Sequence, residues 1–400
     1  MVSMGHTEPS PRRLIVLGVV LAVAAVVAVS AFTGAGASAP TTRAPSTPAV
    51  HGGVKPVLSG LILMPNQAAY LHGLPFPTVD PGVLGSDGPA FVGTAVDVGW
   101  SQLEPTEGRY DWAPLDASLA AVSAYNHTHP SSTLGVKLRV VGGYDAPSWA
   151  TSTGGAPITV EDRTHGAAPG TLGRWWTAPY QAAWSTFEHA LAARYDTNPL
   201  IRTVQVTSCA TTTEEPFITP GSPTDRALLT DDGWTTADEE ACLSGAFAAY
   251  SGWHHTPIDY PINTLDVELD GRRSADTAFP AQIASECASS SARGGPECII
   301  DNHGLRDTSA SSPGSSWLFA LMDQLWQQHP ATTEVALQAF SPTAGEDCAA
   351  VAVAVTHHAR SVELWAPSPV PSGFQGFRSV PLASLTAWNR SLRSGTPPAC

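Results

Sequence analysis

The chain alternates short apolar runs with longer segments in which apolar residues recur every three or four positions. Eight such runs follow one another, at 57–65, 91–100, 134–143, 200–209, 262–271, 297–304, 333–342 and 361–367. Several of them alternate apolar and polar residues, which is typical of a strand with two different faces. The pattern therefore predicts eight β-strands.

Helical spacing dominates between the runs. The clearest segment is 177–195, where Tyr180, Trp184, Phe187 and Leu191 lie four, three and four positions apart and so share one helix face. Further helices are predicted at 112–125, 236–253, 280–292, 314–329, 346–359 and 381–392. Only the stretch after the first run, which contains DPGVLGSDGPA, is a poor helix.

Strand and helix thus alternate eight times, a pattern typical of a parallel sheet. Eight units favour a closed (β/α)8 TIM barrel of the α/β class, a single domain over 57–400, and the alternative is an open doubly wound sheet. A dinucleotide-binding fold has no support, because no G-x-G-x-x-G follows the first run.

The N-terminus precedes this domain with a different pattern. Arg12 and Arg13 stand before an uncharged run, Leu14 to Phe32, and small residues follow. Residues 1–32 are therefore predicted to be a signal peptide or a retained single-pass membrane anchor. Residues 33–56, rich in Pro, Ala and Thr, are predicted to be a linker. Either interpretation places the barrel outside the cell or on the outer face of the cytoplasmic membrane.

Charge and cysteine content narrow the function. The 35 acidic residues outnumber the 20 Lys and Arg, which argues against a nucleic-acid partner. No metal constellation and no cofactor motif is found. The six cysteines lack zinc-site spacing and, in an exported chain, predict disulfides. Sequential pairing is the simplest of fifteen connectivities, and the alternatives stay open: Cys209–Cys242, Cys287–Cys298 and Cys348–Cys400.

Alternation along the strands predicts an unusually polar barrel interior. In GVKLRVV, Leu138 and Val140 would face the helices, so Lys137 and Arg139 would point inward. The same reasoning places a set of carboxylates inside: Asp97, Asp266, Glu268, Asp270, Glu334 and Glu363. Buried charges must be paired, so we expect one ion-pair network that fills the barrel.

Function is expected at the C-terminal ends of the strands, where barrel enzymes carry their sites. Aromatic and carboxylate residues gather there, together with other polar side chains: Trp100, Glu104, Tyr144, Trp149, Glu214, Glu215, Asp270, Asn302, His303, Gln338 and Trp365. Indole faces stack on sugar rings, and paired carboxylates cleave glycosidic bonds. The residue types therefore predict a carbohydrate site.

The stretch GWSQLEPTEGRYDW, from Gly99 to Trp112, sharpens that prediction. It resembles the second strand–helix unit of the retaining barrel glycosidases, the clan that includes β-galactosidases, cellulases and xylanases. LRVVGGYDAPSWA, which contains Arg139, resembles the third strand of that clan, and VELWAP, with Trp365, resembles the eighth. The resemblance implies a glycoside hydrolase in which a carbohydrate is the substrate.

The same resemblance implies catalytic roles and exposes two departures. Glu215 stands where the clan has its acid/base glutamate at the end of the fourth strand, and Glu214 replaces the usual asparagine. At the nucleophile position of the seventh strand the chain has Gln338, and an amide cannot act as a carboxylate nucleophile.

Three explanations for Gln338 remain open. The strand register could differ from the one assumed. Another carboxylate could serve, Asp270 or Glu268 on the fifth strand or Asp301 on the sixth. Alternatively, the barrel is catalytically inactive and binds a cell-surface glycan or polysaccharide. A purely structural surface protein is a third possibility for the whole chain.

Overall fold

The computed structural model describes residues 53–64, 75–161, 169–269, 272–290, 297–339, 344–366, 377 and 380–400. The chain divides into two compact units, 1–42 and 43–400. The predicted signal or anchor at 1–32 and nearly all of the predicted linker lie outside the described residues. Within the described part, no helix combines the length and apolar character needed to cross a membrane.

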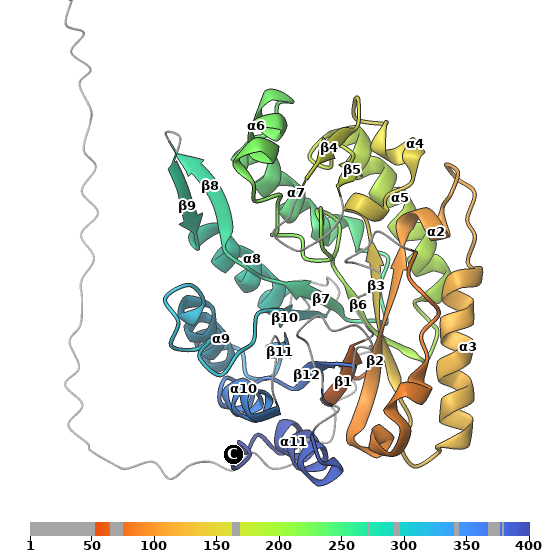
Figure 1. The fold of residues 1–400 in the computed structure, drawn as a ribbon, viewed down its shortest axis with the longest axis vertical. Helices are drawn as coiled ribbons and strands as arrows, with labels where there is room; N and C mark the ends of the chain where they lie inside the picture. The colour runs from red at the N-terminus through yellow and green to blue at the C-terminus, as the bar shows by residue number, and fades with distance from the viewer. Residues whose placement is uncertain are drawn as a thin grey trace, which may run out of the picture. The chain divides into compact units, whose positions relative to one another are not determined.

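Eight parallel strands close into a barrel in the order β1-β12-β11-β10-β7-β6-β3-β2 (Figure 1). Their bounds are β1 Gly60–Met64, β2 Phe91–Gly99, β3 Gly135–Val141, β6 Ile201–Gln205, β7 Ile258–Pro261, β10 Cys298–Asp301, β11 Glu334–Gln338 and β12 Ser361–Trp365. The predicted (β/α)8 TIM barrel is confirmed, and the open doubly wound sheet is excluded because β1 pairs with both β2 and β12.

The predicted helices are present with bounds shifted by a few residues. They are α3 Ala113–Thr128, α5 Ala178–Tyr195, α7 Thr236–Ala249, α8 Ala278–Ser289, α9 Ser316–Gln328, α10 Ala344–Thr356 and α11 Leu382–Ser394. Shorter elements lie in the loops: η1 Pro81–Ala90, α2 Trp100–Leu103, η2 Gly143–Asp145, α4 Ser148–Thr151 and α6 Pro223–Asp231. The unclear first segment is thus a 3-10 helix, η1, whose glycines and prolines disfavour an α-helix.

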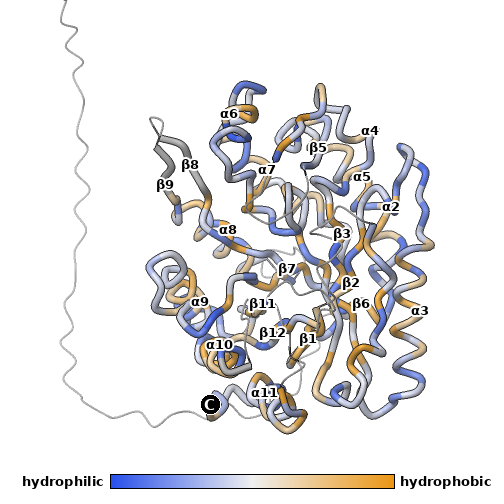
Figure 2. The backbone as a smooth tube through the Cα atoms, viewed as in Figure 1, coloured by the Kyte–Doolittle hydropathy of each residue, from blue (hydrophilic) through white to orange (hydrophobic). Residues whose placement is uncertain are grey.

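Helix α5 shows why the helical spacing was a reliable signal. Tyr180, Trp184, Phe187 and Leu191 are all buried against the barrel. The ring of Trp100, at the end of β2, meets Trp184 edge-on at 5.1 Å. Figure 2 shows hydrophobic stretches along the strands of the barrel, interrupted by hydrophilic positions. These interruptions include the inward-facing polar residues of the interior.

The fifth strand was predicted at the wrong place. It is β7, Ile258–Pro261, whereas the run 262–271 begins a separate antiparallel hairpin of β8 Leu265–Leu269 and β9 Arg272–Asp276. Asp266 and Glu268 therefore do not lie in the barrel sheet, and Asp270 lies outside the described residues. Both segments have strand-like alternation, but β7 is only four residues long, so the longer hairpin strand gave the stronger pattern.

The sequential disulfide pairing is confirmed at all three bridges. Cys209–Cys242 joins the segment after β6 to α7, Cys287–Cys298 joins α8 to β10, and Cys348–Cys400 joins α10 to the C-terminal tail. Each bridge ties a helix or the chain end to the barrel, which restricts the unfolded chain and so favours the folded state. A second small hairpin, β4 Ile158–Val160 with β5 Gly170–Leu172, lies beside the end of β3.

Candidate active site at the barrel mouth

Lys137 lies at the centre of the barrel interior, as the alternation of β3 predicts. Its ammonium is 3.0 Å from Asp259 on β7 and 2.7 Å from Asp301 on β10, and it also bonds Glu363 on β12. Burial alone would lower the pKa of Lys137, but the three carboxylates outweigh it and raise the pKa. Three strands are thus held together by one ammonium group.

Arg139, two residues further along β3, forms a second layer above Lys137. Its Nε donates to Asp97 on β2 at 2.6 Å, and its Nη1 donates to Gln338 on β11 at 3.2 Å. The same Nη1 is 3.5 Å from both Glu214 and Glu363. Arg139 is fully buried. Its contacts with Glu363 and Glu214 connect the deep interior to the mouth.

The predicted inward carboxylates only partly belong to this network. Asp97 and Glu363 do, as predicted. Glu334, at the start of β11, instead pairs with Arg360 at 3.2 Å, away from Lys137. Asp259 is a member that the sequence reasoning missed, because the fifth strand was placed on the wrong segment. The correct strand would have given Asp259 as an inward residue between Ile258 and Tyr260.

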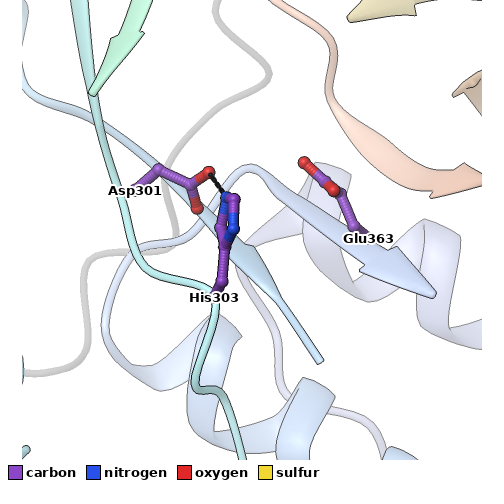
Figure 3. Close-up of side chains that lie close together, drawn as sticks. All are labelled: Asp301, His303 and Glu363. Atoms are coloured by element: carbon purple, nitrogen blue, oxygen red, sulfur yellow. Dashed lines mark hydrogen bonds and ion pairs between the residues drawn. The ribbon is translucent and has the colours of Figure 1, made fainter. Parts of the chain in front are cut away.

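Asp301, His303 and Glu363 come close enough together to suggest a metal site, with one donor atom of each within 4.8 Å of the others. Figure 3 shows Asp301 bonded to His303, with Glu363 facing them from β12. However, the Lys137 ammonium already bonds both carboxylates. A divalent cation there would have to displace or lie against that ammonium, so the donor set does not fit a metal, and we assign none.

Glu214 lies in the loop that follows β6 and is buried at the mouth. Its Oε1 is 3.2 Å from Nδ1 of His303 and 3.5 Å from Nη1 of Arg139. Burial would raise the pKa of Glu214, but the hydrogen bond from His303 and the charge of Arg139 lower it to about 2. Glu214 is therefore a carboxylate at any physiological pH.

His303 connects Glu214 to the interior network. Its Nε2 is 3.0 Å from Asp301, on the opposite side of the ring from Glu214. Burial would lower the pKa of His303, but Asp301 and Glu214 outweigh it and raise the pKa well above the usual value. The ring is accordingly an imidazolium between two carboxylates.

Glu215 and Gln338 were the two residues on which the sequence hypothesis depended. Glu215 is partly buried, next to Glu214, and its charge contributes to the raised pKa of His303. Gln338 faces the interior at the end of β11, at the height expected for the nucleophile, and is hydrogen-bonded to Arg139. Gln338 pairs with Glu363 in the sheet register. The carboxylate at the same height in the barrel is therefore Glu363, on the neighbouring strand β12.

Several residues expected at the mouth instead make structural contacts. Trp100 is fully buried among α5 side chains, and its indole N–H donates to Glu104 at 2.8 Å. The indole N–H of Trp149 donates to the backbone oxygen of Glu104 at 3.0 Å. These contacts leave Trp100 and Glu104 without a surface for a sugar. The Asn302 amide likewise holds backbone groups, the Ile262 carbonyl and the Gly304 N–H.

Two aromatic candidates retain a place near the opening. Trp365, at the end of β12, clusters with Met64 and Ala95 on the inner face and is 6% exposed. Tyr144, after β3, is partly buried, and its ring lies against Gly170 of the β4–β5 hairpin.

Asp145, the next residue, is a mouth carboxylate that the sequence reasoning did not single out. Its position directly after the third strand, in GGYDAP, is the signal that could have found it.

Compared with known proteins, the chain matches no family model and no curated protein. Among solved structures it is similar to endo-glycoceramidase II from Rhodococcus sp., at 14% identity and a TM-score of 0.49, over 82% of this chain and 78% of that one. It is also similar to an endogalactoceramidase, at 16% identity and a TM-score of 0.45, over 85% of this chain and 74% of that one.

A third similar structure is the catalytic domain of a beta-amylase from Paenibacillus polymyxa, at 12% identity and a TM-score of 0.42. That match covers 80% of this chain and 98% of the other. Similarity at this level assigns neither family nor activity, so the function must be inferred from the side chains at the mouth.

Proposed function

We propose that this protein hydrolyses a glycosidic bond at the mouth of the barrel, with Glu214 as the ionised carboxylate. The observation that carries the proposal is the position of Glu214: a buried carboxylate at the end of the fourth strand, held by Arg139 and His303. A glycosidase needs one carboxylate that stays ionised to attack the sugar or to activate water. The low pKa of Glu214 suits that role and does not suit a proton donor.

Glu363 is the other carboxylate near Glu214, and we assign it a supporting role. Because both lie 3.5 Å from the same Arg139 nitrogen, these two oxygens are at most about 7 Å apart. However, Glu363 is 1% exposed and is bonded to Lys137 below the mouth. It therefore fixes the two cations rather than meeting a substrate.

In the reaction, Glu214 attacks the anomeric carbon or takes a proton from an attacking water. The positive charge that develops on the sugar ring is stabilised by the same carboxylate, while Arg139 and His303 hold the carboxylate in place. A second group must protonate the leaving oxygen. The resemblance to the retaining clan implies Glu215 for this step, as general acid and base.

The second candidate function is carbohydrate binding without turnover, and Gln338 favours it. The amide occupies the position at which the resemblance places the nucleophile, and it is engaged with Arg139. In that case Trp365 and the polar residues of the mouth would recognise a glycan. We also propose that the protein acts outside the cytoplasm, which its three disulfides support.

Hydrolysis of a panel of aryl glycosides by the wild-type protein and by Glu214→Gln separates the two functions. We expect the variant to lose activity by on the order of 10²–10⁴ on every glycoside that the wild type cleaves. Glu107→Gln is the matched control, because Glu107 is exposed to solvent, whereas Glu214 is buried.

Equal rates for wild type and Glu214→Gln would remove Glu214 from the mechanism. If the wild type cleaves nothing but binds an oligosaccharide saturably, as measured by calorimetry, the non-catalytic function is the correct one.

A further inference from the structure

The Asp145 side chain lies next to a glycine, Gly99, at the mouth of the barrel. It ends η2, directly after β3. Alternation along β2 places Ala95, Asp97 and then Gly99 on the inner face of the barrel. A Cβ on Gly99 would lie 3.2 Å from Cβ of Asp145 and 3.5 Å from its Oδ1. The Asp145 side chain therefore lies against the space where a side chain at position 99 would begin, above Asp97.

The backbone that carries Asp145 is docked onto the loop that carries Glu214. The Tyr144 N–H donates to the Thr211 carbonyl at 3.0 Å. Gly143 has a φ of 56°, and a Cβ there would lie 1.9 Å from the same carbonyl oxygen. Only glycine fits this conformation and this approach. Asp145 and Glu214 thus lie in contacting loops that follow two adjacent strands, β3 and β6, at the same end of the barrel.

The environments of the two carboxyl groups differ in the sense that acid–base catalysis requires. Burial raises the pKa of Asp145 to about 7, so a large share of this group is protonated at neutral pH. Glu214, between two cations, has a pKa of about 2. Carboxyl groups whose pKa values are pushed apart in this way are the usual signature of an acid and a base or nucleophile, and here both lie at the same end of the barrel, on loops joined by the bond between Tyr144 and Thr211.

We propose that Asp145, rather than Glu215, is the general acid of the mouth. The proposal rests on the proposed glycosidase function and assigns the proton donor within it. As the bond between the anomeric carbon and the leaving oxygen breaks, its electron pair goes to that oxygen, and Asp145 transfers its proton there, so that an alcohol leaves. The anomeric carbon bonds instead to an oxygen of Glu214 or of the attacking water. The Asp145 carboxylate regains its proton from the water that completes hydrolysis, directly or, where Glu214 took that proton, through solvent. Glu215 instead contributes its negative charge next to the imidazolium of His303.

Leaving-group dependence tests this assignment. A general acid matters for a poor leaving group, such as an alkyl or phenyl glycoside, and hardly at all for a 2,4-dinitrophenyl glycoside, whose leaving group departs as an anion. For Asp145→Asn we expect a near wild-type kcat/KM on the dinitrophenyl glycoside and a fall in kcat/KM on the order of 10²–10⁴ on the phenyl glycoside. The alkaline limb of the pH–rate profile on the phenyl glycoside should also disappear.

Glu215→Gln and Glu214→Gln, assayed with the same two substrates, complete the experiment. The assignment predicts no leaving-group dependence for Glu215→Gln and loss on both substrates for Glu214→Gln. If Glu215→Gln shows the leaving-group dependence instead, or if a folded Asp145→Asn is affected equally on both substrates, Asp145 is not the acid, although the glycosidase function stands. A wild-type protein that cleaves neither substrate, nor any glycoside of the panel, overturns both.

Discussion

The barrel contains two groups of charged residues that differ in how their carboxyl groups are paired. In the deep group, Lys137 is surrounded by Asp259, Asp301 and Glu363, all at most 1% exposed. In the mouth group, Glu214 and Asp145 lie at the opening. Glu214 is held between two cations, whereas burial raises the pKa of Asp145. In the deep group three carboxyl groups share one ammonium, whereas in the mouth group Glu214 has a pKa of about 2 and Asp145 a pKa of about 7.

This difference shows how the fold separates stability from chemistry on the same strands. A buried ion pair gains little over an apolar core, but it is costly to break. The deep carboxylates are therefore paired with Lys137 and are not available to contact a ligand. Arg139 and His303 connect the interior network to Glu214. Their positive charges lower the pKa of Glu214 and so keep it ionised.

Removing the deep cation should have the largest effect. Lys137→Met would leave three buried carboxylates without their ammonium, and we expect the free energy of unfolding to fall by about 3–5 kcal/mol. Chemical denaturation at neutral pH measures it. Lys55→Met is the control, because the Lys55 ammonium donates to two neutral oxygens, the Asn198 carbonyl and the Thr256 hydroxyl. A loss no larger for Lys137→Met than for Lys55→Met would mean that the deep group does not act as a stabilising unit.

The sequence predicted this arrangement unevenly, for physical reasons. Alternation along β3 and β12 was enough to place Lys137, Arg139 and Glu363 inside, because a strand has only two faces. It could not say which carboxylates meet which cation, since that depends on the order and stagger of strands around the barrel. Asp259 was missed because a longer hairpin strand nearby has the same alternation as the short β7.

The mouth was harder to predict than the interior. Loop residues have no periodicity, so Trp100 and Glu104 were expected in the site although they pack behind it. Glu214 and Glu215 are adjacent in sequence, and only the fold distinguishes the one that meets Arg139. Asp145 gives no pattern of its own, because its role depends on the absence of a side chain at Gly99 on another strand.

The link between the two groups is tested by His303→Asn, with a smaller expected effect. The hydrogen bond from His303 lowers the pKa of Glu214, so its loss should raise that pKa from about 2. A carboxylate that must be ionised for activity then loses its charge at a higher pH. The acid limb of the kcat/KM profile should therefore move to higher pH, with some loss of rate at neutral pH.

His254→Asn is the matched control for this change. The His254 side chain is exposed, and its backbone N–H, which the substitution keeps, is what contacts Asp196. An acid limb that stays in place in His303→Asn would show that Arg139 alone keeps Glu214 ionised, and that the interior network does not reach the mouth through His303.

The smallest effect is expected from Gly99→Ala, which adds a methyl group beside Asp145 and the Gln102 side chain. The new Cβ would lie 3.2 Å from Cβ of Asp145, so the aspartate must shift by a few tenths of an ångström. We expect a loss of less than about 10-fold on a phenyl glycoside, because misplacement of a catalytic group by a full ångström costs about 10²-fold. The dinitrophenyl glycoside should be cleaved at the wild-type rate, since its leaving group departs without an acid.

Gly314→Ala, at a position with open space around it, controls for the added methyl group. Equal losses on both glycosides would place the effect on Glu214 or on the sugar, and would separate Gly99 from the proton donor.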